Sequence, residues 1–145
     1  MKKLIALAAI AAATPAIAGH HEDKANGHSK MLMAGLLGTN QVNGGDEDGR
    51  GQFMAWPDAE GQLCYRLMVS NVDAPTAAHI HSGAAGVNGG VVVGLSAPTD
   101  GKVEGCATVD ADTMAALWAE PGAYYVNVHN AEHPAGAVRG QLMSH

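Results

Sequence analysis

A chain of 145 residues is long enough to bury one hydrophobic core but too short for two ordinary domains. Nineteen glycines and an aromatic content of 4% indicate many turns around a core of aliphatic side chains, which favours an all-β fold over a helical bundle. The formal net charge of −6 argues against nucleic acid and anionic lipid as partners.

Residues 1–18 have the composition of a secretory signal peptide. Lys2 and Lys3 supply the positive start, residues 4–13 the apolar run, and residues 16–18 the small side chains of a cleavage site. The apolar run is too short to span a bilayer, so we expect no membrane insertion of the mature chain. The sequence therefore predicts export, to the periplasm or as a secreted protein.

Residues 19–29 combine charged and polar side chains without apolar periodicity, which predicts a flexible tail containing His20, His21 and His28. After cleavage behind residue 18, His21 would be the third residue. A free amine, two amide nitrogens and that imidazole can make a square-planar site for copper(II) or nickel(II). A solvated tail is the favoured interpretation, because the metal site depends on the position of one cleavage bond.

Residues 30–143 are predicted to form one β-sandwich domain. Apolar alternation, interrupted by turn residues, predicts strands over residues 30–37, 51–56, 63–69, 76–81, 90–95, 102–109, 123–129 and 137–143. Before the seventh strand, Met114, Leu117 and Trp118 recur at helical spacing behind a candidate cap at Asp110. About eight strands and one short helix make a β-sandwich the natural architecture.

Two cysteines in an exported chain, Cys64 and Cys106, predict one disulfide, with free thiols as the alternative. Strand alternation supports the bond. Leu63 and Tyr65 look like core residues, so Cys64 between them should point outward. Cys106 should likewise point outward, because Ala107 beside it looks like a core residue, and a bond across the outer faces of adjacent strands fits both positions.

Histidines on two predicted strands are the candidate functional residues. His79 and His81 are two residues apart, so their side chains project from the same face of one strand. Asn127 and His129 share a face of another strand in the same way. If these strands are neighbours, the four side chains form one polar cluster.

The imidazoles of His79, His81 and His129, with His133 as a candidate fourth ligand, suit copper or zinc. The alternative is a structural cluster, in which the rings form hydrogen bonds with Asn127, Arg139 or the backbone. Both interpretations remain open on the sequence alone.

Methionine and arginine offer two further possibilities. Six methionines follow the leader, at positions 31, 33, 54, 68, 114 and 143. Their thioethers could bind copper(I), but their scatter over separate predicted strands favours a role in core packing. Arg139 stands in an otherwise apolar last strand, where an ion pair with an acidic loop is the favoured interpretation.

Four ordered motifs together resemble the CHRD domain, named after chordin, in its stand-alone bacterial secreted form. They are residues 78–83 (AHIHSG), 89–93 (GGVVV), 125–129 (YVNVH) and 133–142 (HPAGAVRGQL). The resemblance extends over residues 30–142. Ala137 stands where the family commonly has Glu, and Asn130 where it commonly has Thr, but neither difference affects the histidines.

The resemblance implies an exported binding or structural domain, without enzymatic activity, whose partner is an unknown protein or a metal ion. The order of elements is also similar to the Greek-key sandwich of copper/zinc superoxide dismutases, which likewise carry an H-x-H strand. A dismutase-like metalloenzyme is a weaker alternative, because it needs more histidine ligands and a zinc site with an aspartate. A protein-interaction module with a purely structural histidine cluster is another. No catalytic residue is predicted, since the sequence has no nucleophile elbow.

Overall fold

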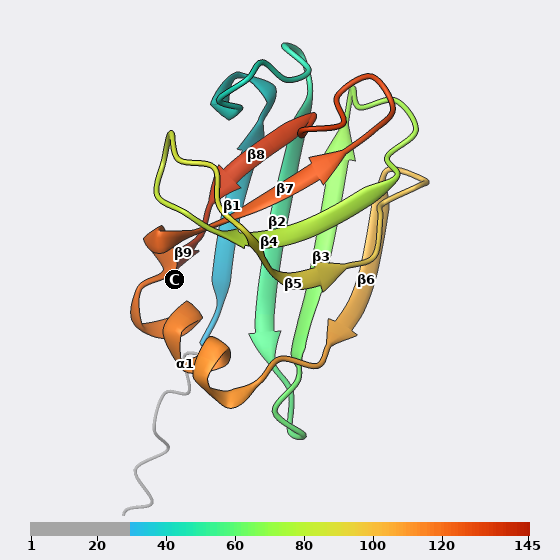
Figure 1. Cartoon of the computed structure of the whole chain (residues 1–145). Coiled ribbons are helices and arrows are strands. Elements are labelled where there is room, and N and C mark those ends of the chain that lie inside the picture. Colours follow the sequence, from blue (N-terminus) through green and yellow to red (C-terminus); the bar gives the residue numbers. More distant parts are fainter. Residues whose placement is uncertain (1–29) are drawn as a thin grey trace, which may run out of the picture.

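Figure 1 shows the computed structural model of the protein, which describes residues 30–145. The elements are β1 (Leu32–Leu37), β2 (Arg50–Pro57), β3 (Leu63–Ser70), β4 (Ala77–Ser82), β5 (Val91–Leu95), β6 (Lys102–Ala107), α1 (Ala111–Ala119), β7 (Tyr124–His129), β8 (Val138–Gln141) and β9 (Met143–Ser144). The predicted all-β fold with one short helix is confirmed, and the last predicted strand is divided between β8 and β9. The predicted signal peptide and tail lie outside the described residues and stay predictions.

The strands form a single antiparallel sheet in the order β5-β4-β7-β8-β1-β2-β3-β6, with β9 beside β1. The sheet curls into two layers, β5-β4-β7-β8 and β1-β2-β3-β6, and is nearly closed like a barrel (Figure 1). The chain changes layer between β3 and β4, between β5 and β6 and again between β6 and β7, as in a Greek key. The layers join where Leu37 of β1 pairs with Arg139 of β8. Beside this pair, a Cβ on Gly140 would collide with the Gly35 carbonyl, so the seam needs a glycine there.

Strand alternation places the core between the two layers. Leu32 and Leu36 of β1 are buried on one side, and Ile80 of β4 and Val126 and Val128 of β7 are buried on the other. Every second residue of these strands therefore points outward, away from the core. A register slip of one residue would expose the apolar set, so burial fixes which side chains face outward.

The predicted helix is confirmed as α1. The Asp110 carboxylate accepts a hydrogen bond of 2.9 Å from the Thr113 amide, which caps the first turn. Leu117 is fully buried and anchors the helix on the core. No helix in residues 30–145 is long and apolar enough to cross a membrane.

The prediction that the methionines fill the core is wrong for most of them. Met114 of α1 packs against the core, whereas Met33 of β1, Met54 of β2 and Met68 of β3 are not among the residues that form or contact it. These three alternate with buried neighbours such as Phe53, so their side chains lie on the outer face of the β1-β2-β3 layer.

Cys64 of β3 and Cys106 of β6 are direct cross-strand partners and form the predicted disulfide. The outward orientation inferred from strand alternation is also correct, because the next outward pair, Arg66 and Glu104, forms an ion pair of 2.7 Å across the same two strands. The bond holds β6, the last strand of its layer, against β3.

The disulfide closes a separation of 42 residues. Replacing both cysteines by alanine should therefore lower the free energy of unfolding by about 4 kcal/mol, chiefly because the unfolded chain gains entropy. Denaturant unfolding of wild type and variant measures the difference. The matched control is the double variant Arg66→Ala/Glu104→Ala, where an exposed ion pair should cost less than about 1 kcal/mol. A disulfide effect no larger than that of the control would contradict the expectation.

Candidate functional site

Two neighbouring strands bring the predicted histidines together. His79 and His81 alternate with the fully buried Ala78 and Ile80, so both imidazoles lie on the outer face of β4. β4 pairs with β7 over their whole length, as the predicted cluster required. His129 lies opposite the small side chain of Ala77, which leaves room for its ring to lean towards His79.

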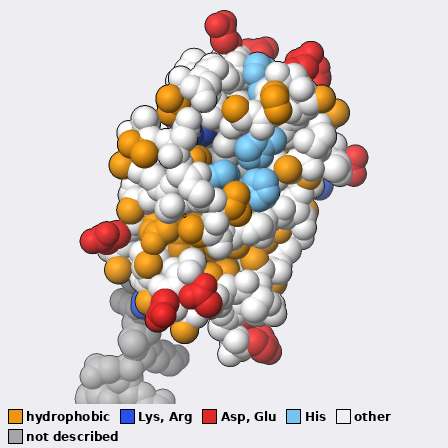
Figure 2. Space-filling view, viewed as in Figure 1, with side chains coloured by type: hydrophobic (Ala, Val, Ile, Leu, Met, Phe, Trp, Pro, Cys, Tyr) orange, Lys and Arg blue, Asp and Glu red, His pale blue; other side chains and the backbone are white. Residues whose placement is uncertain are grey.

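The rings of His79, His81 and His129 converge. One ring nitrogen from each lies within 4.8 Å of the others, and Nδ1 of His79 lies 3.2 Å from Nε2 of His129. Figure 2 shows histidine side chains near the centre of this face, among hydrophobic and uncharged atoms, with acidic side chains mainly at its margins. No carboxylate belongs to this group of ligand atoms in the described part of the chain.

Backbone carbonyls determine the tautomers of two rings. Nδ1 of His81 lies 2.9 Å from the Gly89 carbonyl, and Nδ1 of His129 lies 3.0 Å from the Pro134 carbonyl. Because a carbonyl oxygen can only accept, each Nδ1 carries the proton and each Nε2 carries a lone pair. His79 must then donate from Nδ1 to Nε2 of His129.

Nε2 of His81 is buried and has no hydrogen-bond partner among the described residues. Burying a polar atom without a partner costs free energy, so such an atom calls for an explanation. His81 belongs to the same cluster of ligand atoms as the other two rings. The arrangement can accept a cation, whether a proton or a metal ion.

Two of the three rings are hard to protonate. Burial lowers the pKa of His79 below its usual value of 6.5, and positive charge on His129 or His81 would lower it further. Burial also lowers the pKa of His129, although the hydrogen bond to Pro134 acts in the opposite direction. The lone pairs therefore stay available at pH values where an isolated histidine would take up a proton.

The loop of residues 83–90 folds over the sheet beside the histidines and supplies the Gly89 carbonyl. Arg139 holds this loop: its guanidinium donates to the carbonyls of Ala84 and Val87, at 2.9 and 2.7 Å, and to Oδ1 of Asn88 at 3.1 Å. The predicted ion pair of Arg139 with an acidic loop is wrong, because its partners within residues 30–145 are these neutral oxygens, Oε1 of Gln141 at 3.4 Å and an aromatic ring.

That ring belongs to Tyr125. The guanidinium carbon of Arg139 lies 3.4 Å from the ring centroid, and the His81 ring stacks on the same tyrosine with centroids 4.9 Å apart and planes inclined by 10°. The Tyr125 hydroxyl also accepts a hydrogen bond from the Gly89 amide at 3.2 Å. Arg139, Tyr125 and Gly89 therefore fix the orientation of His81.

Two residues predicted for the cluster have other surroundings. The ring of His133 is not part of the converging group, and its backbone amide donates to Oδ1 of Asn130 at 2.8 Å within the turn after β7. Asn127 is buried and accepts a 2.6 Å hydrogen bond from Gln41, while its amide donates to the Ala135 carbonyl. Asn127 therefore ties loops together beside the histidines and forms no hydrogen bond with them.

Sequence reasoning missed the carbonyls of Gly89 and Pro134 as orienting groups. The only signal in the sequence was the glycine in the loop beside His81. A Cβ on Gly89 would collide with the Ser82 carbonyl, so a side chain cannot be accommodated where the loop returns beside His81.

The lowered pKa values predict an acid-sensitive face in metal-free protein. As the pH is lowered, the histidines of the unfolded chain take up protons near pH 6.5, whereas folded His79 and His129 do so only at lower pH. The free energy of unfolding should therefore be highest above pH 6.5 and should fall as the pH drops towards the folded pKa values. Unfolding in the presence of a chelator, from about pH 7.5 to about pH 5, measures this slope.

The double variant His79→Asn/His129→Asn should show a smaller slope, because the amide cannot titrate. Proton resonance titration of the His79 ring supplies an independent reading. A midpoint at or above 6.5 would contradict the expectation.

Comparison with known proteins identifies a family. The family model described as the CHRD domain matches residues 32–142, which include both histidine strands and the disulfide. No curated protein and no solved structure shows significant similarity to the chain. CHRD domains are binding or structural modules without enzymatic activity, typically extracellular, and a disulfide is consistent with that environment. The chain belongs to the CHRD domain family.

Proposed function

We propose that this CHRD domain is exported and binds one copper or zinc ion through His79, His81 and His129. The observation that carries the proposal is the buried Nε2 of His81, which has no partner within residues 30–145, in a residue whose ring converges with two further imidazoles. Imidazole nitrogen is a preferred ligand of both metals.

The spacing of the nitrogens supports a shared ion. Two nitrogens bound at about 2.0–2.1 Å to one tetrahedral ion lie about 3.3 Å apart. Nδ1 of His79 and Nε2 of His129 are separated by 3.2 Å. To bind the ion through Nδ1, the neutral His79 ring moves its proton to Nε2. The ligand nitrogen of His81 lies within 4.8 Å of the other two.

The carbonyl contacts support the same conclusion. Metal-binding histidines usually donate their second ring N–H to a carbonyl or carboxylate, which fixes the tautomer and orients the ring. His81 and His129 already donate to Gly89 and Pro134 in this way. Three protein ligands leave a fourth position of a tetrahedral ion for water or for a group from a partner.

Export fits the disulfide and the leader-like residues 1–18. The formal charge of −6 also favours cations over anions near the protein. A dismutase-like enzyme receives no support from the site, because its ligand atoms comprise three imidazoles and no carboxylate.

The test is titration of the metal-freed full chain with Zn(II) and, separately, Cu(II), followed by calorimetry and thermal unfolding. We expect one ion per site and a stability gain of about 2.7 kcal/mol when free metal is 100 times the Kd. The variant His79→Asn/His81→Asn should bind at least about 100-fold more weakly, because loss of orienting groups alone costs 10 to 100-fold.

His133→Asn is the matched control and should bind as the wild type does, since this ring lies outside the converging group. Equal affinity of the wild type and His79→Asn/His81→Asn would place any bound metal elsewhere, for example on His20, His21 or His28. That result would leave the cluster with a structural role and overturn the proposal.

A further inference from the structure

Three methionines form one row across three adjacent strands. Met33 of β1 pairs directly with Met54 of β2 on one side and with Met143 of β9 on the other. Direct cross-strand partners project from the same face of a sheet, so the three side chains stand side by side. Figure 1 places these strands in the layer that lies behind β4 and β7, so the row is on the opposite side of the core from the histidines.

The row has no role in the core. Met143 is 57% exposed, and Met33 and Met54 are half-buried on the outer surface while their chain neighbours Leu32 and Phe53 are buried. A large apolar side chain on an outer face loses the stabilisation it would gain by full burial. A row of three such side chains at matching register positions therefore calls for another explanation.

Metal binding by the thioether sulfurs is one such explanation. Direct partners have Cβ atoms about 4.5–5.5 Å apart, and each methionine sulfur lies two bonds beyond Cβ on freely rotating torsions. Sulfurs from Met54 and Met143 can therefore reach a point above Met33 from both sides. Met68 of β3 lies opposite Gln52, two residues before Met54, which brings a fourth thioether within diagonal reach.

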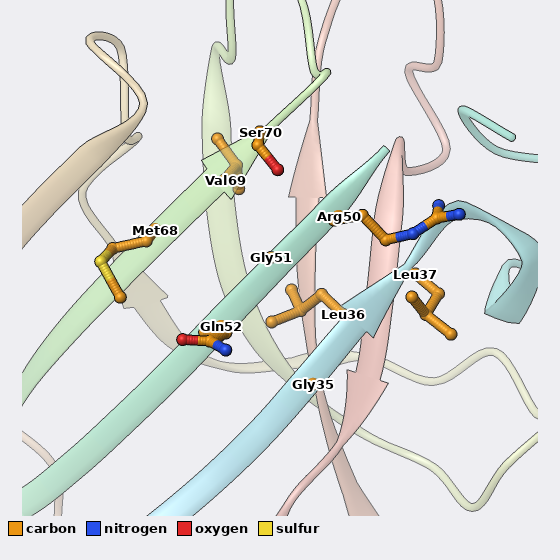
Figure 3. Close-up of a pocket in the computed structure, with 9 residues that line it drawn as sticks. All are labelled: Gly35, Leu36, Leu37, Arg50, Gly51, Gln52, Met68, Val69 and Ser70. Atoms are coloured by element: carbon orange, nitrogen blue, oxygen red, sulfur yellow. The ribbon is translucent and has the colours of Figure 1, made fainter. Parts of the chain in front are cut away.

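The surroundings admit a small cation. Arg66 and Glu104, which continue the row beyond Met54, neutralise each other at 2.7 Å, and the nearby cation Lys102 lies opposite Met68 rather than opposite a methionine of the row. Gly35, two residues from Met33, leaves open space above the sheet, since nothing lies within 4 Å of the position a Cβ would take. Figure 3 shows the neighbouring hollow, about 480 Å³ in volume, whose lining includes Gly35, Arg50, Gln52 and Met68 but none of the three methionines of the row.

We propose that Met33, Met54 and Met143 form a binding site for copper(I), separate from the histidine cluster. Uncharged, polarisable thioethers prefer a soft monovalent ion, whereas zinc and copper(II) prefer the imidazoles of the other face. The CHRD domain would then carry two metal sites that differ in ligand softness and are separated by the hydrophobic core.

The experiment uses the full chain with its histidine cluster saturated by Zn(II). Ag(I) is the probe, because it is soft, monovalent and stable in air, and Cu(I) is tested anaerobically against a competing copper(I) chelator. Methyl resonances of the methionines report the ligands directly. Trp56, two residues after Met54 on the same face, adds a fluorescence signal once Trp118 is replaced by phenylalanine.

We expect one Ag(I) per chain, with shifts of the Met33, Met54 and Met143 methyl resonances and no shift for Met114, which packs on the core. The triple variant Met33→Leu/Met54→Leu/Met143→Leu should bind Ag(I) and Cu(I) at least about tenfold more weakly, since leucine keeps the volume but lacks sulfur. Met114→Leu is the matched control and should bind as the wild type does.

Unmoved methyl resonances, or equal affinity of the triple variant and the wild type, would overturn the proposal and leave the row as an apolar surface. The three side chains lie outside the core and leucine keeps their volume, so the triple variant should fold, which circular dichroism checks. A His79→Asn/His81→Asn variant without zinc should keep its Ag(I) site, so failure of the histidine proposal and failure of this one are distinguishable.

Discussion

The face that carries the histidines depends on one buried cation. Arg139 is 1% exposed, and among the described residues no carboxylate neutralises it. Carbonyl oxygens of the loop 83–90 and the face of Tyr125 take that role instead. A buried charge without these partners would be very costly, so the guanidinium and the loop stabilise each other. Because the loop also carries Gly89, the orientation of His81 follows from this contact.

Much of the fold could be predicted because it repeats a short period. Alternation located the strands to within a few residues, put His79 and His81 on one face and gave the outward direction of Cys64. Local signals cannot show which loop returns over which strand. For that reason Arg139 was expected to pair with a carboxylate, and His133, four residues beyond His129, was expected near the cluster although its turn keeps it apart.

The methionines also show that local sequence signals do not reveal which side chains lie next to each other. Met33, Met54 and Met143 are widely separated in the sequence, and their alignment depends on the registers of β1 with β2 and β9. A shift of either register by one residue would put the sulfurs on opposite faces. Apolar residue type suggested burial, but the strand parity set by Leu32 and Phe53 decided otherwise. Parity is therefore more informative than residue type for flexible apolar side chains.

The near closure of the sheet bears on how the protein behaves among its own copies. β5 and β6 end the strand order, and an open sheet would present both edges, with their unpaired amides and carbonyls, to neighbouring molecules. Here the curl of the sheet brings β5 and β6 close to each other, and the disulfide holds β6 in position against β3. Each edge thereby obstructs the approach of a foreign strand to the other. The curl thus protects the chain against edge-to-edge aggregation.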